Sequence, residues 1–342
     1  MEKYNPESTG LKTNGIFGLP YTQEQSQLVI LPAPWDVTNS FGDGTSLCPS
    51  QIQALSSQID LYDPWFQNAF EKGIFMQPEN SKWVDENKHL RRLAKSIIES
   101  LEHNKPLDLQ QRNDLKKINK TCSEFHEFNY LQSLELMKQG KAVGLLGGDH
   151  STALGNIKAH IEYHGPDLGI LQFDAHADLR IAYQGFQHSH ASIMDNVLKL
   201  DQAPSKLIQV GIRDYCESEF LYTQQDDRID TYFDHQIQDQ LLAGTQWTQI
   251  EKDIAIELPK NVYISMDIDG LTPDLCPSTG TPVPGGVTYN QFAHLLKTLV
   301  NLGKNIVGFD LCEVSPQTEW DSIVGSRVLY KLCAATLACR SK

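Results

Sequence analysis

The sequence predicts an α/β protein in which helices cover both faces of a parallel β-sheet. Short apolar segments that read as buried strands alternate with segments of helical length, as in a series of β–α–β units. The segments expected to form strands are residues 28–32, 142–146, 168–173, 207–210, 261–266 and 305–309. Polar residues follow most of these strands directly, at the sheet edge where parallel α/β proteins bind ligands.

The N-terminal third is expected to be organised differently. Residues 1–26 look irregular, and the first strand leads into PWDVTNSFGDGTSLCP, which is either an active-site loop or a plain connector. Residues 49–140 have the character of helices without strong strands, with helices expected over 87–103 and 114–140. Because this stretch is far longer than one helical crossover and is not low in complexity, we expect a helical elaboration packed on the core.

Further helices are expected between the later strands and after the last one. They are placed over residues 152–164, 190–200, 234–242, 247–258, 289–302 and 325–339. No change in composition and no fixed repeat divides the chain, so residues 1–342 are expected to form one domain.

Composition excludes several classes of function. The 342 residues carry a formal net charge of −14, which argues against binding to nucleic acid. The polar N-terminus MEKYNPESTGLKTNG does not resemble a secretion signal, and no apolar run is long enough to cross a membrane. Seven cysteines, none in a CxxC pair, indicate neither a disulfide framework nor a zinc ribbon, so we expect a cytoplasmic protein.

The segment GILQFDAHAD, residues 169–178, carries the strongest chemical signal. Asp174, His176 and Asp178 alternate directly after an apolar run, so in an extended chain they would face the same side. Crowded carboxylates repel one another unless a cation lies between them. Alone, this triplet could equally be a solvated strand end.

Two further strands end in residues of the same kind. Asp267 and Asp269 repeat the alternation, and His150 follows a Gly-Gly pair that lets the backbone turn sharply. The whole set has four carboxylates, two imidazoles and no thiolate, which does not suit a structural zinc site. It suits manganese or a similar divalent ion, and two such ions would neutralise the four aspartates.

The motifs GGDHS, DAHAD, SMDIDGLTP and GTPVPGG together resemble the ureohydrolases, that is, arginase, agmatinase and related guanidino hydrolases. The resemblance implies a three-layer α/β/α sandwich around a parallel eight-stranded sheet, usually assembled as a trimer or hexamer. It implies two Mn²⁺ ions per chain, with Ni²⁺ as an alternative. Asp174 and Asp267 would bridge both ions, His150 and Asp178 would complete one site, and His176 and Asp269 the other.

The resemblance assigns two more residues. His190, in HSHASIM, matches a proton shuttle at the mouth of the site, and Glu313, in DLCEVSP, matches the glutamate that orients the guanidinium group. Without the other motifs, Glu313 would read as a carboxylate at a helix start. Asp178 would pass a proton from the attacking hydroxide to the departing amine.

The segment after DAHAD resembles the agmatinase branch, which converts agmatine to putrescine and urea and belongs to polyamine biosynthesis. The expected substrate is therefore a small cationic guanidino compound, with guanidine, guanidinobutyrate or arginine as alternatives. Trp320 could wall off the pocket through a cation–π contact, or it could be a core or subunit-interface residue. Arg180 could be a counter-charge for the acidic cluster or a partner for a substrate carboxylate.

Two other classes of protein remain open from the sequence. A deacetylase-like amide hydrolase on a related fold would use one zinc ion and would not need the full set of ligands. A metal-stabilised binding protein would need neither Glu313 nor His190.

Overall fold

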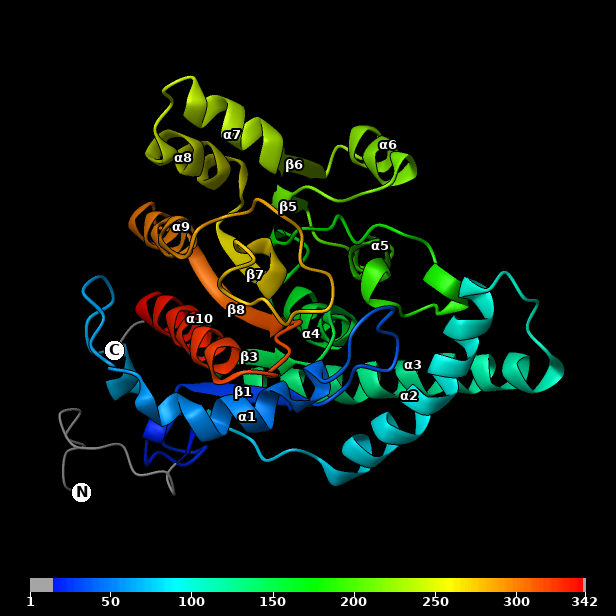
Figure 1. Cartoon of the computed structure of the whole chain (residues 1–342). Helices are drawn as coiled ribbons and strands as arrows, with labels where there is room; N and C mark the ends of the chain where they lie inside the picture. Colours follow the sequence, from blue (N-terminus) through cyan, green and yellow to red (C-terminus); the bar gives the residue numbers. More distant parts are fainter. Residues whose placement is uncertain (1–14, 341–342) are drawn as a thin grey trace.

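The centre of the structure, a computed structural model that describes residues 15–340, is an eight-stranded parallel β-sheet (Figure 1). Every pairing between neighbouring strands is parallel, and the order is β2-β1-β3-β8-β7-β4-β5-β6. The strands are β1 (Leu28–Ala33), β2 (Ile74–Met76), β3 (Ala142–Gly147), β4 (Leu168–Phe173), β5 (Lys206–Ile212), β6 (Ile229–Phe233), β7 (Asn261–Asp267) and β8 (Asn305–Cys312). The predicted fold class is confirmed.

The sequence analysis missed the two edge strands. Strand β2 has three residues, too few to show periodicity, and it lies inside the segment that was expected to have no strong strands. Strand β6 has half-buried residues between its two buried ends, so it lacks the continuous apolar run of a central parallel strand. All six predicted strands are present.

Helices cover both faces of the sheet and complete the three-layer sandwich (Figure 1). Helices α1, α7, α8, α9 and α10 share one hydrophobic cluster with the sheet, and α2, α3, α4 and α5 share a second, while α3 and α4 also contribute to a smaller third cluster. The helices are α1 (Cys48–Leu55), α2 (Ser81–Glu102), α3 (Leu109–Lys138), α4 (Ala153–His164), α5 (Ile193–Leu198), α6 (Glu217–Gln225), α7 (Asp234–Leu242), α8 (Trp247–Glu257), α9 (Tyr289–Asn301) and α10 (Glu319–Ala338).

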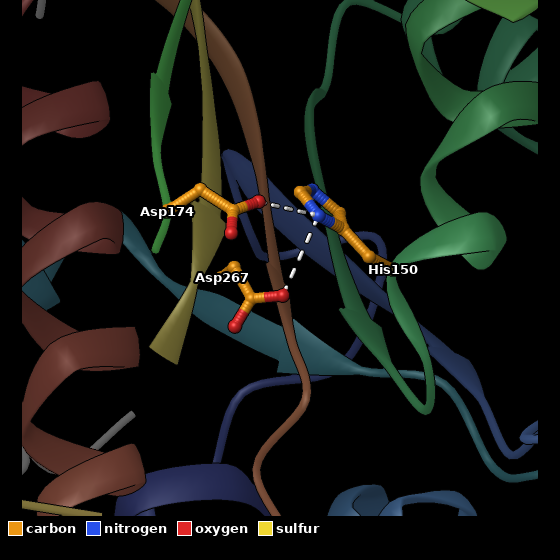
Figure 2. Close-up of side chains that lie close together, drawn as sticks. All are labelled: His150, Asp174 and Asp267. Atoms are coloured by element: carbon orange, nitrogen blue, oxygen red, sulfur yellow. Dashed lines mark ion pairs between the residues drawn. The ribbon is translucent and has the colours of Figure 1, made fainter. Parts of the chain in front are cut away.

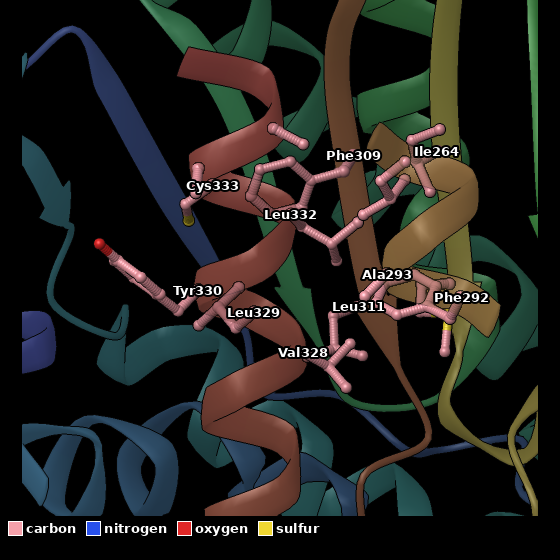
Figure 3. Packing of buried hydrophobic residues seen from close by; sticks show 14 of the residues in the cluster. Ile264, Phe292, Ala293, Phe309, Leu311, Val328, Leu329, Tyr330, Leu332 and Cys333 are labelled. Atoms are coloured by element: carbon pink, nitrogen blue, oxygen red, sulfur yellow. The ribbon is translucent and has the colours of Figure 1, made fainter. Parts of the chain in front are cut away.

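Helix α10 shows how a covering layer is held to the sheet. Figure 3 shows Val328 and Leu332 of α10 beside Leu311 of β8, and all of these side chains are almost completely buried. Burying each such side chain stabilises the fold by roughly 1.5–3 kcal/mol. The helix begins six residues earlier than expected, because Thr318 and Asp321 form a capping box at its N-terminus.

The two long helices of the N-terminal third also begin earlier than the sequence suggested. Helix α2 starts at Ser81, and α3 starts at Leu109, where Asp108 and Gln111 form a capping box. The two helices pack against each other, and the Gln111 side chain donates to Ser100 Oγ of α2 at 2.8 Å. Of the segment expected to be irregular, residues 1–14 lie outside the described part of the chain, and Ile16–Gly18 forms a 3₁₀ turn.

Candidate metal centre

The predicted site residues gather at the carboxyl ends of four adjacent central strands. His150 follows β3, Glu313 follows β8, Asp267 ends β7, and Asp174 follows β4. Strands β3 and β4 are consecutive among the strands of the chain but are separated in the sheet by β8 and β7. Such a reversal of strand order opens a crevice at the carboxyl edge of the sheet, where open α/β folds bind ligands.

His150 is the centre of a first group of donors. Its Nδ1 lies 3.1 Å from Asp174 Oδ2, 3.0 Å from Asp178 Oδ2 and 3.5 Å from Asp267 Oδ2. Figure 2 shows the carboxylates of Asp174 and Asp267 directed at the imidazole from β4 and β7. All these side chains are buried.

His176 is the centre of a second group. Its Nδ1 lies 3.1 Å from Asp269 Oδ2 and 3.6 Å from Asp174 Oδ1. One donor atom per residue can be chosen so that all lie within 4.8 Å of one another in two sets, His150 with Asp174 and Asp267, and His176 with Asp174 and Asp269, so Asp174 belongs to both. One carboxylate shared by two groups of donors is the arrangement that a bridging ligand requires.

The backbone brings these residues together differently from the way the sequence analysis assumed. The chain does not stay extended through Asp178: β4 ends at Phe173, and Asp178 has a left-handed backbone with φ of 54°. The Asp174 side chain instead accepts the backbone N–H of His176 at 2.7 Å. Convergence therefore comes from a turn stabilised by the aspartate itself, because short acidic side chains favour such turns.

The second aspartate pair is also held by a turn. Strand β7 ends at Asp267, whose side chain accepts the backbone N–H of Asp269 at 2.9 Å within a 3₁₀ turn. Ile268 between them is buried. Asp269 Oδ1 also accepts the backbone N–H of Ala175 at 3.0 Å, which ties this turn to the one after β4.

The chemistry of the donor set fits cations. Burial and the neighbouring Asp269 and Asp174 carboxylates raise the pKa of Asp267 well above its usual range, and burial followed by Asp174 raises that of Asp178 to about 7. His150 Nδ1 faces carboxylates at hydrogen-bonding distances but not at hydrogen-bonding angles, so it has no hydrogen-bond partner within residues 15–340. Buried carboxyl groups beside an imidazole nitrogen without a hydrogen-bond partner match divalent-cation ligands, because a cation would stabilise the charged form of each carboxylate.

The other nitrogen of His150 is fixed from behind. Nε2 lies 2.9 Å from Ser265 Oγ, and that hydroxyl donates to the carboxylate of Asp310 at 3.0 Å. Asp310 is fully buried on β8 and also accepts the backbone N–H of Met266 at 3.2 Å. This chain fixes the ring so that Nδ1 faces the aspartates, as second-layer partners do for metal-binding histidines.

Glu313 is built into the same edge of the sheet. Its backbone is left-handed, with φ of 61°, a conformation that costs roughly 1–2 kcal/mol in a residue other than glycine. Its backbone N–H donates to Gly148 O at 2.8 Å, and its Oε1 accepts the backbone N–H of His150 at 2.9 Å. Burial, and then Asp149, raises the pKa of Glu313 well above its usual range, so a cationic ligand would stabilise its charged form.

His190 reaches the site from a different loop. Burial, and then the charge of His176, lowers the pKa of His190 to about 3, so the ring is neutral near pH 7. Its Nε2 lies 3.3 Å from Ser40 Oγ, and its backbone N–H donates to Thr38 Oγ1 at 3.3 Å.

The donors open into a pocket of about 150 Å³. Asp178, His190 and Glu313 line it, together with His176, Asp267 and Asp269. Several other residues of its wall were not predicted individually, because they come from segments far apart in the sequence: Asn39, Ser40, Phe41, Tyr183, Asp214, Glu219, Gly280 and Thr281.

Arg180 and Trp320, whose roles the sequence left open, lie in different places relative to the pocket. Arg180 lines the pocket, but its carboxylate partner is Glu219, 3.5 Å from Nε, and its guanidinium lies over the Tyr183 ring at 4.7 Å. Trp320 is not among the residues that line this pocket. It is about half exposed in the first turn of α10, and its indole N–H donates to Asp274 O at 2.9 Å.

Comparison with known proteins gives one consistent result. The chain matches the arginase family over residues 26–337. It is 30% identical over 319 residues to N(1)-aminopropylagmatine ureohydrolase of Thermus thermophilus, covering 92% of each chain. It is 27% identical to the agmatinase of Halalkalibacterium halodurans, over 86% of this chain and 85% of that one.

Solved structures share the fold. Proclavaminate amidino hydrolase from Streptomyces clavuligerus superposes with a TM-score of 0.70 at 20% identity, over 98% of this chain and 100% of that one. Agmatine ureohydrolase of Thermoplasma volcanium superposes with a TM-score of 0.68 at 21% identity, over 93% of this chain and 92% of that one.

None of the helices within residues 15–340 has the length and apolar character that a membrane span requires.

Proposed function

The chain belongs to the arginase family of hydrolases, and from this premise we propose that it is a two-metal ureohydrolase that releases urea from a cationic guanidino compound, with agmatine as the lead substrate. The observation that carries the proposal is the pair of donor groups that share Asp174 beside the buried carboxylate of Glu313. A single-metal site would not need the second group.

In this proposal the six predicted ligands hold two divalent ions, manganese first and nickel second. His150 and Asp178 would hold one ion and His176 and Asp269 the other, with Asp174 and Asp267 as the further ligands. The bound ions supply Lewis acidity, which lowers the pKa of a water molecule toward neutrality. The residues around them determine where the substrate lies and where protons go.

Glu313 binds the guanidinium group. Its Oε1 is fixed by the backbone N–H of His150, so the carboxylate is held in place before the substrate arrives. A planar guanidinium can donate paired hydrogen bonds to a carboxylate. Holding the substrate carbon toward the aspartates removes much of the entropic cost of bringing it to the attacking water.

Asp178 and His190 handle the protons. Water attacks the guanidinium carbon, the bond from that carbon to the alkyl-bearing nitrogen breaks, and the products are urea and an amine. Asp178 faces the interior of the site and carries the proton from water to the departing nitrogen. His190, neutral and beside the Ser40 hydroxyl, exchanges protons with solvent.

The charges of the pocket favour a substrate without an α-carboxylate. Asp214 and Glu219 add carboxylates beyond the ligand cluster, whereas Arg180 is the one Lys or Arg among the described residues that line the pocket. Arg180 already faces Glu219 and Tyr183. The names of the relatives, N(1)-aminopropylagmatine ureohydrolase and agmatinase, support the same class of substrate. Guanidine, guanidinobutyrate and arginine are the alternative substrates. Cleavage of agmatine would place the protein in polyamine biosynthesis. We also propose that the protein is a cytoplasmic homo-oligomer.

The test combines metal analysis with a substrate panel. Protein stripped by a chelator and reloaded with manganese or nickel is assayed for urea with agmatine, N(1)-aminopropylagmatine, guanidine, guanidinobutyrate and arginine. We expect two ions per chain and the highest kcat/KM with a substrate that lacks a carboxylate. Full activity with one zinc ion per chain would support a deacetylase-like hydrolase instead. A preference for arginine that Arg180→Ala removes selectively would overturn the substrate assignment.

A further inference from the structure

One wall of the pocket comes from two loops that carry none of the proposed metal ligands. Residues 36–44, after β1, supply Asn39, Ser40 and Phe41, and residues 180–190 supply Arg180, Tyr183 and His190. Both loops contact the long helices α2 and α3 of the N-terminal third, which lie along one side of the molecule in Figure 1.

The first loop is anchored where it leaves the sheet. The Trp35 side chain is fully buried and stacks on Phe125 of α3, with ring centroids 4.6 Å apart and planes 11° apart. Trp83 of α2 packs edge-on against it at 6.0 Å. The next residue, Asp36, accepts from the Asn87 side chain of α2 at 2.9 Å. The start of the loop is thus held by both helices.

Arg91 of α2 holds the rest of this loop. Its side chain is about nine-tenths buried, and its guanidinium donates to the carbonyl oxygens of Val37 (3.2 Å), Asn39 and Gly42 (3.0 Å). Its Nε donates to Asp43 Oδ1 at 3.0 Å. A buried guanidinium that satisfies three loop carbonyls fixes the shape of the loop, because each carbonyl would otherwise be short of a partner.

Helix α3 holds the second loop through Asn119. Its side-chain amide donates to Gly185 O at 3.1 Å, and its carbonyl oxygen accepts the backbone N–H of Gln187 at 2.9 Å. The loop needs such support because Ala182 and Gln184 have left-handed backbones, with φ of 46° and 54°. The two loops then meet at His190, which contacts Ser40 and Thr38.

We propose that the α2–α3 pair is a clamp that sets the substrate-binding wall of the pocket, with Arg91 and Asn119 as its positioning residues. The inference rests on the proposed function, since it assumes that this pocket binds the guanidino substrate. It assigns a role to the helical elaboration, which supplies no proposed ligand: the helices position the side chains that contact the part of the substrate beyond the guanidinium.

The test uses Arg91→Met and Asn119→Ala in the full-length, metal-loaded protein, each with a matched control on the same helix. Arg92→Met and Asn113→Ala change exposed neighbours that have no hydrogen bond or ion pair among the described interactions. Three quantities are measured: metal content, hydrogen exchange of the amides in both loops, and steady-state kinetics with agmatine and with free guanidine.

We expect Arg91→Met to keep its metals, to exchange the amides of residues 36–44 at least tenfold faster, and to raise KM for agmatine about tenfold while kcat changes less than threefold. The effect on guanidine should be smaller, because guanidine does not reach the wall. Asn119→Ala should likewise speed exchange of the amides of residues 180–190 and raise KM for agmatine, and because this loop carries His190 it should also lower kcat. Arg91→Lys, which keeps one donor group, should recover part of the KM effect, and both controls should match the unaltered protein.

Each contrary result is informative. Unchanged amide exchange and unchanged KM in Arg91→Met and Asn119→Ala would overturn the proposed clamp. Loss of metal together with a lower kcat and an unchanged KM would also overturn it, because that combination indicates general damage to the protein. If Arg91→Met does not fold, Arg91→Lys and Asn119→Ala decide by the same criteria. If no guanidino compound is cleaved, the proposed function fails, and the exchange measurements still decide whether the helices hold the loops.

Discussion

Gly148 is the residue at which the fold and the site depend most directly on each other. A Cβ added to it would lie 1.8 Å from Trp35 O and 2.6 Å from Trp35 C, both backbone atoms. Ordinary contacts of a Cβ begin near 3.4 Å, so the two backbone segments would have to separate by about 1.6 Å. The backbone cannot absorb this as a side chain would, because Gly148 N and Asp149 N both donate to the segment 33–35.

The displacement would reach the site from both sides. Gly148 O accepts the backbone N–H of Glu313, and His150, two residues later, donates its backbone N–H to Glu313 Oε1. A misplacement of about 1 Å at reacting groups costs roughly a hundredfold in rate. We therefore expect Gly148→Ala to lower kcat/KM for urea release by at least about a hundredfold and to weaken metal binding.

The control for this variant is Gly165→Ala, after α4. There the added Cβ meets nothing within 4 Å, but the backbone φ of 89° imposes the conformational strain of a residue other than glycine. It should reduce thermal stability slightly and leave kcat/KM unchanged. Urea release and metal content are measured for both variants. If Gly148→Ala keeps its metals and a kcat/KM within threefold of the unaltered protein, the steric reasoning is wrong.

Three further predictions concern the charged groups. Asp174→Ala should lower the metal content to one ion per chain or none, because Asp174 belongs to both donor groups. Asp269→Ala should lower it to one ion, because Asp269 belongs to one group. Elemental analysis that finds two ions per chain in either variant would contradict the grouping. Glu313→Gln should keep both ions and lower kcat/KM at least about a hundredfold, through loss of a charge-assisted contact, and loss of metal would instead make Glu313 a ligand. Burial on α4 lowers the pKa of His160 to about 3. The folded protein therefore cannot bind the proton that the unfolded chain takes up near pH 6.5. For that reason the free energy of unfolding should fall as the pH drops below 6.5. Between pH 7 and pH 5 the cost is about 2 kcal/mol, which His160→Phe should remove in denaturant titrations of metal-free protein; the same pH dependence in both proteins would refute this.

The fold class could be predicted because central parallel strands are buried on both faces and therefore appear as continuous apolar runs. The edge strands β2 and β6 lack that property, and both were missed. Helix starts were placed too late where capping residues precede the first apolar turn, as at Asp108 and Thr318. A capping box occupies only a few polar residues, so its signal is weak beside the hydrophobic period of the helix.

The residues of the candidate metal centre could be picked out for a related reason. Each lies within a few residues of the end of a buried strand, so the parallel sheet itself brings them to one edge. The geometric argument used for Asp174, His176 and Asp178 was wrong in detail, because the chain turns after Phe173. The residues still converge, since side chain–backbone hydrogen bonds of the aspartates fold the turns inward.

The pocket wall has a weaker local signal: the segment after β1 could be marked only as either an active-site loop or a connector. The wall forms only where two loops more than a hundred residues apart in the sequence come together. One loop supplies Asn39, Ser40 and Phe41, and the other supplies Tyr183 and His190. What holds these loops is a guanidinium and an amide on helices that contain no proposed ligand, at Arg91 and Asn119. Under the proposed function, the metal ligands therefore lie next to the strands, whereas the choice among guanidino substrates would depend on contacts between segments far apart in the sequence. For that reason, substitutions in α2 and α3 should alter substrate preference before they alter metal content.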